Sequence, residues 1–138
     1  MKLAEDQARA RLLEHDHGVL CTVHSERGVD AVPVVYATNP AGFVGVPIDR
    51  VKPKGSLRLQ RERNLERDPR ATLLIEHWDR HDWSKLWWVR AELKHADDSG
   101  QENQLAETLA NRFSQYESQP FSHLLVLSIE RVSGWAAI

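Results

Sequence analysis

Hydrophobic and polar residues alternate with a period of two along much of this chain, a pattern typical of β-strands. The clearest case is residues 83–96, where one face would carry Trp87, Val89, Ala91 and Leu93 and the other Trp88, Arg90, Glu92 and Lys94. Alternation therefore predicts that Trp87 and Trp88 lie on opposite faces of one strand and cannot fill the same core.

Five further runs rich in β-branched and apolar residues predict strands at residues 19–24, 29–38, 43–46 or 43–48, 71–78 and 123–132. The turn-forming Ser25-Glu26-Arg27-Gly28 joins the first two of them as a hairpin. Pro33 lies within the second run, which indicates a strand at a sheet edge or with a bulge.

Helical spacing is predicted for three segments. The first covers residues 3–14, with Gly18 as a left-handed cap after it, and the second covers residues 54–67, with Ser56 as a cap and Asp68-Pro69 as a stop. The third begins at a capping-box pair of Ser99 and Glu102 and buries one stripe that runs from Leu105 to Phe113.

The predicted order is α-β-β-β-α-β-β-α-β, without a long crossover helix between most strands. That order favours an antiparallel barrel over a doubly wound parallel sheet. We therefore expect a mainly β, α+β fold with six strands and peripheral helices. At 138 residues, a single domain spanning 1–138 can bury its own core.

Composition indicates a soluble, cytoplasmic protein. The single cysteine, Cys21, has no partner for an intramolecular disulfide and lies in an apolar run. No apolar stretch approaches the roughly 20 residues that cross a bilayer, and the N-terminus is too acidic for a secretory signal. The net charge of −2 gives no general reason to expect a nucleic acid or membrane partner.

The basic residues are nevertheless concentrated in one stretch. Eight of the 18 lysines and arginines lie between Arg50 and Arg70. Lys52, Lys54, Arg50 and Arg58 fall where a strand ends and a helix begins, so they can gather with free backbone N–H groups around a phosphate. The residues alone favour a solvated basic surface, and Arg61 to Arg70 are assigned mainly to the surface of the helix. A nucleic-acid contact through residues 58–70, which Glu62 and Glu66 would weaken, is the other alternative.

Other candidate chemistry is sparse. His77 and His81 lie among metal-ligand residue types, but their spacing fits no metal signature, so His77 is assigned either to a cofactor contact or to a structural role. The chain has no Gly-x-Ser-x-Gly, Gly-x-Gly-x-x-Gly or Walker-type phosphate loop, which argues against hydrolases, Rossmann enzymes and nucleotide hydrolases. No catalytic side chain and no metal site are assigned.

Several motifs, taken together, resemble the pyridoxamine 5′-phosphate oxidase-like superfamily and, within it, a group of coenzyme F420-dependent enzymes. The matching segments are Val19-Leu20-Cys21-Thr22-Val23, Val32-Pro33-Val34-Val35-Tyr36, Asp49-x-x-Lys52-Pro53-Lys54, Arg63-Asn64-Leu65-x-x-Asp68-Pro69-Arg70-Ala71, Trp83-Ser84-Lys85-Leu86-Trp87-Trp88-Val89-Arg90-Ala91 and Ser133-Gly134-Trp135. They are distributed over nearly the whole chain.

This resemblance implies a six-stranded split β-barrel that forms a homodimer and holds FMN or the deazaflavin F420 in grooves shared by both subunits. Lys52 and Lys54 would contact the phosphate, with Arg50 and Arg58 beside them. The ring would be lined by Pro33, Val34, Val46, Pro47 and Ile48, with Trp87 or Trp88 as a wall across the dimer.

The activity implied by the resemblance is F420-dependent hydride transfer to a small organic acceptor. The alternatives are an FMN-dependent oxidase or reductase of the same fold and a cofactor-binding module without turnover.

Overall fold

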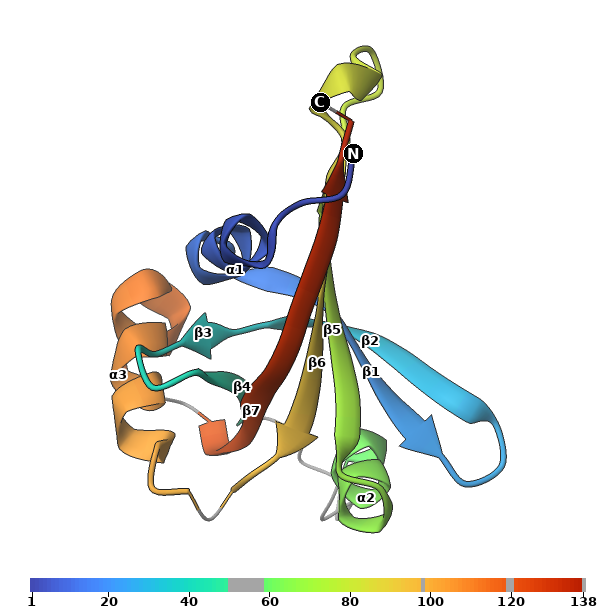
Figure 1. Ribbon diagram of the computed structural model, residues 1–138. Helices are drawn as coiled ribbons and strands as arrows, with labels where there is room; N and C mark the ends of the chain where they lie inside the picture. The colour runs from blue at the N-terminus through green and yellow to red at the C-terminus, as the bar shows by residue number, and fades with distance from the viewer. Residues whose placement is uncertain (50–58, 98, 119–120, 138) are drawn as a thin grey trace.

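The computed structural model describes residues 1–49, 59–97, 99–118 and 121–137 of the chain (Figure 1). Within this part, the strands are β1 (His17–His24), β2 (Gly28–Val35), β3 (Ala37–Thr38), β4 (Phe43–Asp49), β5 (Arg70–His77), β6 (Trp87–His95) and β7 (Phe121–Ala136). The helices are α1 (Glu5–Glu14), α2 (Gln60–Arg67) and α3 (Glu102–Arg112), with short 3-10 turns at Trp83–Lys85 and Ser114–Tyr116. None of these helices is long and apolar enough to span a bilayer.

All the strands belong to one curled antiparallel sheet, a half-barrel, in the order β2-β1-β5-β6-β7-β4-β3. The mainly β, antiparallel prediction is confirmed, but the sheet has seven strands, whereas the sequence predicted six. The edge position predicted for the strand with Pro33 is also confirmed, because β1 is the one described strand that pairs with β2, with Pro33 opposite Val19.

The seventh strand arises because the run predicted as one strand over residues 29–38 is divided at Tyr36. Residues before Tyr36 pair with β1 at one edge of the sheet, and residues after it pair with β4 at the other edge, with Thr38 opposite Val44. Tyr36 is fully buried, and its hydroxyl donates a hydrogen bond of 2.6 Å to the carbonyl of Leu12. The chain therefore joins the two edges of the curled sheet at one buried aromatic residue.

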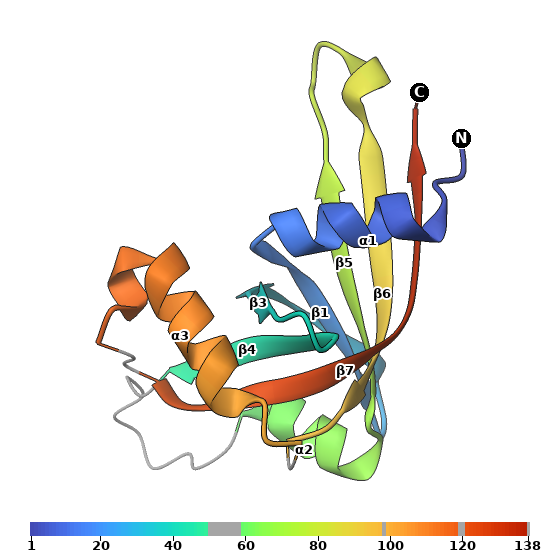
Figure 2. The same cartoon turned by 60° about the vertical axis from the view of Figure 1, so that its left-hand side comes forward.

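The inner face of the sheet forms the main core, with α1 packed over it (Figure 2). Ala8 and Leu12 of α1 are fully buried in the same cluster as Leu20, Leu73 and Val89. A smaller cluster lies under α3, where Leu105 packs so close to β4 that a Cβ on Gly45 would come within 2.9 Å of it. Helix α3 consequently fits against β4 only because residue 45 has no side chain.

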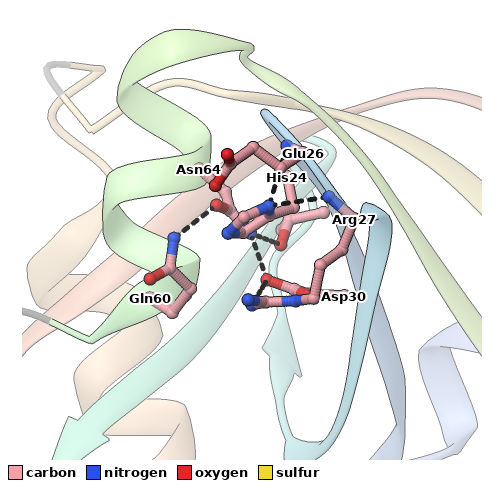
Figure 3. A network of polar contacts seen from close by, with 7 residues as sticks. His24, Glu26, Arg27, Asp30, Gln60 and Asn64 are labelled. Carbon is pink, nitrogen blue, oxygen red and sulfur yellow. Dashed lines mark hydrogen bonds and ion pairs between the residues drawn. The ribbon is translucent and has the colours of Figure 1, made fainter.

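Helix α2 lies against the lower end of the sheet (Figure 1), and buried polar contacts hold it there. The Asn64 side chain is 2% exposed and donates 2.9 Å hydrogen bonds to the Thr22 hydroxyl of β1 and to Asp30 of β2. Asp30 also accepts two hydrogen bonds from Arg27, which lower the pKa of its carboxyl, as the bond from Asn64 does (Figure 3). The side-chain amide of Asn64 thus joins α2 to the hairpin that β1 and β2 form.

A buried carboxylate forms the second anchor of α2. Glu62 accepts a hydrogen bond from the backbone N–H of Leu59 and contacts His123 of β7, with 3.2 Å between Oε2 and Nε2. Because charged groups are rarely buried without a partner, the paired Glu62 fixes how α2 sits on β7.

Three expected helix boundaries differ from the structure. Helix α2 begins at Gln60, so Ser56, which lies outside the described residues, is not its cap. Helix α3 begins at Glu102, one residue after its N-cap Gln101, so Ser99 is not its cap. Gly18 belongs to β1, because α1 ends at Glu14 and His15 is already extended. A side chain at residue 18 would come within 2.5 Å of the Leu74 carbonyl, so Gly18 serves strand packing and not a helix cap.

We predict that Asn64→Ala destabilises the protein by about 1–3 kcal/mol, because it leaves the buried Thr22 hydroxyl without this donor and removes one hydrogen bond from Asp30. Urea unfolding monitored by tryptophan fluorescence would measure the change. Gln60→Ala is the matched control, since exposed Gln60 contacts only the Asn64 side-chain oxygen in this network. Equal losses in the two variants would contradict the assigned role of Asn64.

Candidate functional site

A groove of about 310 Å³ lies where β2 approaches β4. The described residues that line it are His17, Gly18, Pro33, Val34, Val35, Val46, Pro47, Arg61 and Tyr116. Four residues expected to line a cofactor ring, Pro33, Val34, Val46 and Pro47, are therefore brought together from two different strands. Small-molecule sites are typically apolar clefts with a few polar groups, and this groove has that composition.

The other expected ring and wall residues do not line this groove. Ile48 is 5% exposed and belongs to the main core. Trp87 lies on the inner face of β6, at the α1 end of the sheet, and packs against the core. Trp88 points to the outer face, where the Arg90 guanidinium lies 5.2 Å from its ring centroid. The prediction that the two tryptophans occupy opposite faces is confirmed, and their role as cofactor walls stays a prediction.

The phosphate-binding candidates Lys52, Lys54, Arg50 and Arg58 lie outside the described residues. The chain leaves the groove after Pro47 and returns to it at Arg61. The described residues Pro47 and Arg61, which precede and follow these candidates in the sequence, thus line the same groove.

Three polar residues of the groove were not assigned to a site from the sequence. Arg61 was attributed to the helix surface together with the other basic residues of the segment, but it lines the groove at the first turn of α2. Tyr116 reaches the groove from the 3-10 turn after α3, and His17 from the first position of β1. For His17, the sequence feature that could have indicated a site is the polar run His15-Asp16-His17 between an amphipathic helix and a strand.

Beside the groove, aromatic rings form a continuous cluster. His15 stacks on His17 at a centroid distance of 5.3 Å and meets the edge of Trp87 at 5.2 Å. His77, predicted from sequence as a cofactor contact or a structural residue, stacks on the same tryptophan at 6.3 Å, and the Arg11 guanidinium lies 4.9 Å from that ring. His77 is not among the described residues that line the groove, and it is connected to His17 through this cluster. His15, Trp87 and Arg11 of the cluster also line a second hollow beside α1, of about 410 Å³.

Burial lowers the pKa of His15, and the neighbouring His17 and His77 act in the same direction, whereas Asp16 and Glu76 oppose them. The other shifted groups offer little reactivity. Burial raises the pKa of the Cys21 thiol, which disfavours the nucleophilic thiolate. Burial also works against ionisation of Asp97, but hydrogen bonds from His95 and the Val126 amide outweigh it and lower the pKa of that carboxyl.

Among the residues placed by the structure, no three histidine, cysteine or acidic side chains gather as a metal-binding group. The chemistry that the groove offers is therefore that of apolar walls, one arginine, one tyrosine and one histidine.

No family model and no curated protein matches this chain. Solved structures do resemble it. An FAD-binding protein from Mesorhizobium loti aligns with a TM-score of 0.66 and 15% identity over 97% of this chain and 93% of its own. An FMN-binding protein from Syntrophomonas wolfei gives 0.62 and 14% over 96% and 84% of the two chains, and a heme storage protein from Vibrio cholerae gives 0.64 and 13% over 94% and 91%. At these identities the similarity shows that the chain shares their fold.

We predict that the folded state loses stability as pH falls below about 6.5, the ordinary value for histidine. The lowered pKa of His15 means that the unfolded chain binds the proton more tightly, so acid favours unfolding. Unfolding free energies in urea at pH 7.5 and 5.5 would measure the loss, and His15→Gln should make it smaller. The same pH dependence in the variant would contradict this origin.

Proposed function

We propose that this protein is an oxidoreductase that holds the tricyclic ring of FMN or of the deazaflavin coenzyme F420 in the groove between β2 and β4. The observation that supports this proposal is the groove itself, which combines apolar walls with one arginine, Arg61. The walls are formed by Pro33, Val34, Val46 and Pro47. Neighbours with this fold are described as FAD- or FMN-binding proteins, which favours a flavin, and the sequence motifs favour F420.

The walls suit a flat heterocycle for two reasons. Apolar side chains from β2 and β4 can cover the faces of a planar ring, and the outer edge of β2 carries backbone N–H and C=O groups that no other strand pairs with. These edge groups, which pair with no other strand in the part of the chain that the structure describes, can bond the polar rim of a ring. Arg61 adds a permanent positive charge, which suits a phosphate or the negative charge that a ring gains on reduction.

The phosphate end of the cofactor is assigned to Lys52 and Lys54, with Arg50 and Arg58 as helpers. The basis is chemical and topological, because these four cations belong to the segment that connects the groove residues Pro47 and Arg61. Ring and phosphate would then be held by one continuous part of the chain.

With this cofactor bound, the chemistry supplied is hydride transfer, and the protein mainly binds, orients and excludes water. The acceptor is a small organic molecule that can approach the open side of the groove. A form that binds the cofactor without turnover remains the alternative function.

The exposed outer face of the sheet supports the homodimer that the resemblance implies. Val29 is 64% exposed and Leu74 is 37% exposed. Val29 also lines a hollow of about 530 Å³, together with Cys21 and Val23 and with charged residues such as Arg70, Glu92 and Lys94. Strands buried on both faces are apolar on both faces. A second copy would therefore cover β1, β2 and β5 beside the groove.

Titration of the purified protein with FMN, with F420 and, as a competing ligand, with hemin tests the proposal. Arg61→Ala and the double variant Lys52→Ala, Lys54→Ala should each weaken binding of the preferred cofactor about tenfold or more, the effect of losing a hydrogen bond to a charged group. Arg63→Ala is the control, because it removes the same charge from an exposed position of α2. Binding of neither FMN nor F420, or tight binding of hemin alone, would overturn the oxidoreductase assignment.

Catalytic turnover is tested separately, with the same purified protein. A protein that binds the reduced cofactor but passes no electrons to any of a panel of organic acceptors would support the module without turnover.

For the dimer, we predict that Leu74→Glu gives a monomer in sedimentation and light scattering, because it places a charge in the middle of the covered face. Leu13→Glu is the matched control. Leu13 is 39% exposed, close to the value for Leu74, and lies on α1, which packs against the other face of the sheet. A wild-type monomer, or a Leu74→Glu dimer, would contradict the assigned interface.

A further inference from the structure

The groove contains one side chain suited to proton transfer near neutral pH. Among the described lining residues, the polar side chains are those of His17, Arg61 and Tyr116. A guanidinium keeps its proton at every physiological pH, and a phenol ordinarily keeps its proton up to about pH 10. Imidazole is the side chain that exchanges a proton near neutrality, so His17 is the candidate of the three.

A neighbouring carboxylate orients this imidazole. The Nδ1 atom of His17 lies 2.9 Å from Oδ1 of Asp16, so Nδ1 carries the hydrogen that this contact uses. Nε2 is then the ring nitrogen left to meet a ligand in the groove. A histidine held by a carboxylate at one nitrogen and open at the other is the arrangement that general acid–base catalysis uses.

The backbone that carries the pair is held firmly. Arg112 of α3 donates to the carbonyls of Leu13 and His15, at 2.9 and 2.8 Å, and the backbone N–H of Tyr36 donates to the Asp16 carbonyl at 2.9 Å. The close contact of Gly18 with β5 fixes the next position. His17 therefore enters the groove from a rigid segment and not from a loop tip.

We propose that His17, held by Asp16, donates the proton that accompanies hydride transfer in the groove; this inference rests on the proposed function. The reduced cofactor gives a hydride, with its electron pair, to the electrophilic carbon of a polarised double bond in the acceptor. The π electrons move to the partner atom of that bond, which takes the Nε2 proton of the His17 imidazolium. The cofactor is oxidised, the acceptor is reduced by two electrons, and His17 regains its proton from water, to which its side chain is 70% exposed.

The surrounding charges are compatible with this role. Asp16 contacts the His17 imidazole directly, His15 stacks on it, and Arg61 and Tyr116 line the same groove. Arg11 and Glu14 of α1 and Glu76 and His77 of β5 lie near the stacked His15. Burial lowers the pKa of the stacked partner His15, which packs against Trp87.

The test uses the full-length protein loaded with whichever of FMN or F420 it binds, reduced, and then mixed with menadione as the acceptor. His17→Gln should retain the cofactor but slow its reoxidation by about 100-fold or more, the usual contribution of a positioned acid. In the wild type, the rate should fall as pH rises through the histidine range, and in the variant this fall should be absent. Added imidazole should restore part of the rate.

His81→Gln is the control variant, since His81 is exposed in the turn between β5 and β6, away from the groove. Asp16→Asn tests the positioning role and should shift the pH profile with a smaller loss of rate. Reoxidation by menadione that is equally fast in His17→Gln, or a bound reduced cofactor that the wild type does not pass to menadione, would overturn the inference while cofactor binding stands. Failure of the wild type to bind either cofactor would instead overturn the proposed function.

Discussion

The buried crossing at Tyr36 is the constraint on which the rest of the architecture depends. On one side of this residue the chain pairs with β1, and on the other side it pairs with β4, so a single residue holds the two edges of the sheet next to each other. Its hydroxyl bonds to the end of α1, and its backbone N–H bonds to Asp16. A hydroxyl buried without a partner would cost free energy, so the contact to Leu12 fixes both the crossing and the position of α1.

The candidate site is a consequence of that crossing. The groove exists because β2 and β4, which lie far apart in the order of the sheet, approach each other where the chain passes between the edges. The same crossing holds the Asp16 carbonyl and thereby the histidine that lines the groove. Helix α2, anchored by the buried Asn64 and Glu62, then places Arg61 at the other wall. On this short helix, Arg61 lines the groove, and Glu62 and Asn64 after it make the contacts that anchor the helix.

The molecule combines a firmly packed inner face with an outer face on which the exposed apolar residues Val29 and Leu74 lie among charged residues. Leu73 and Ile75 of β5 are essentially buried, whereas Leu74 between them is exposed. This distribution is what a sheet needs if its inner face builds the core of one chain and its outer face meets another. The two faces also explain why the neighbouring tryptophans lie in different surroundings. Trp87 contacts Arg11 of α1, and Trp88 lies beside Arg90.

Local patterns in the sequence determined most of the secondary structure of this protein. Alternation along β6, the edge character of the strand with Pro33, and the antiparallel class all follow from residue-to-residue rules about strands and turns. Pro33, Val34, Val46 and Pro47, which line the groove, were predicted from the sequence as neighbours of a cofactor ring, through its resemblance to a known family.

Only the tertiary structure decided the division at Tyr36, the exclusion of Ile48 from the groove, and the places of Arg61, His17 and Tyr116 within it. In each case, the reason is a contact between residues far apart in the sequence. The local sequence does not show whether a basic residue of an amphipathic helix faces solvent or lines a groove. Where a strand is divided depends on which partner strand each half pairs with. The sequence by itself therefore determined the elements and their class, whereas the curl of the sheet decided which side chains share a site.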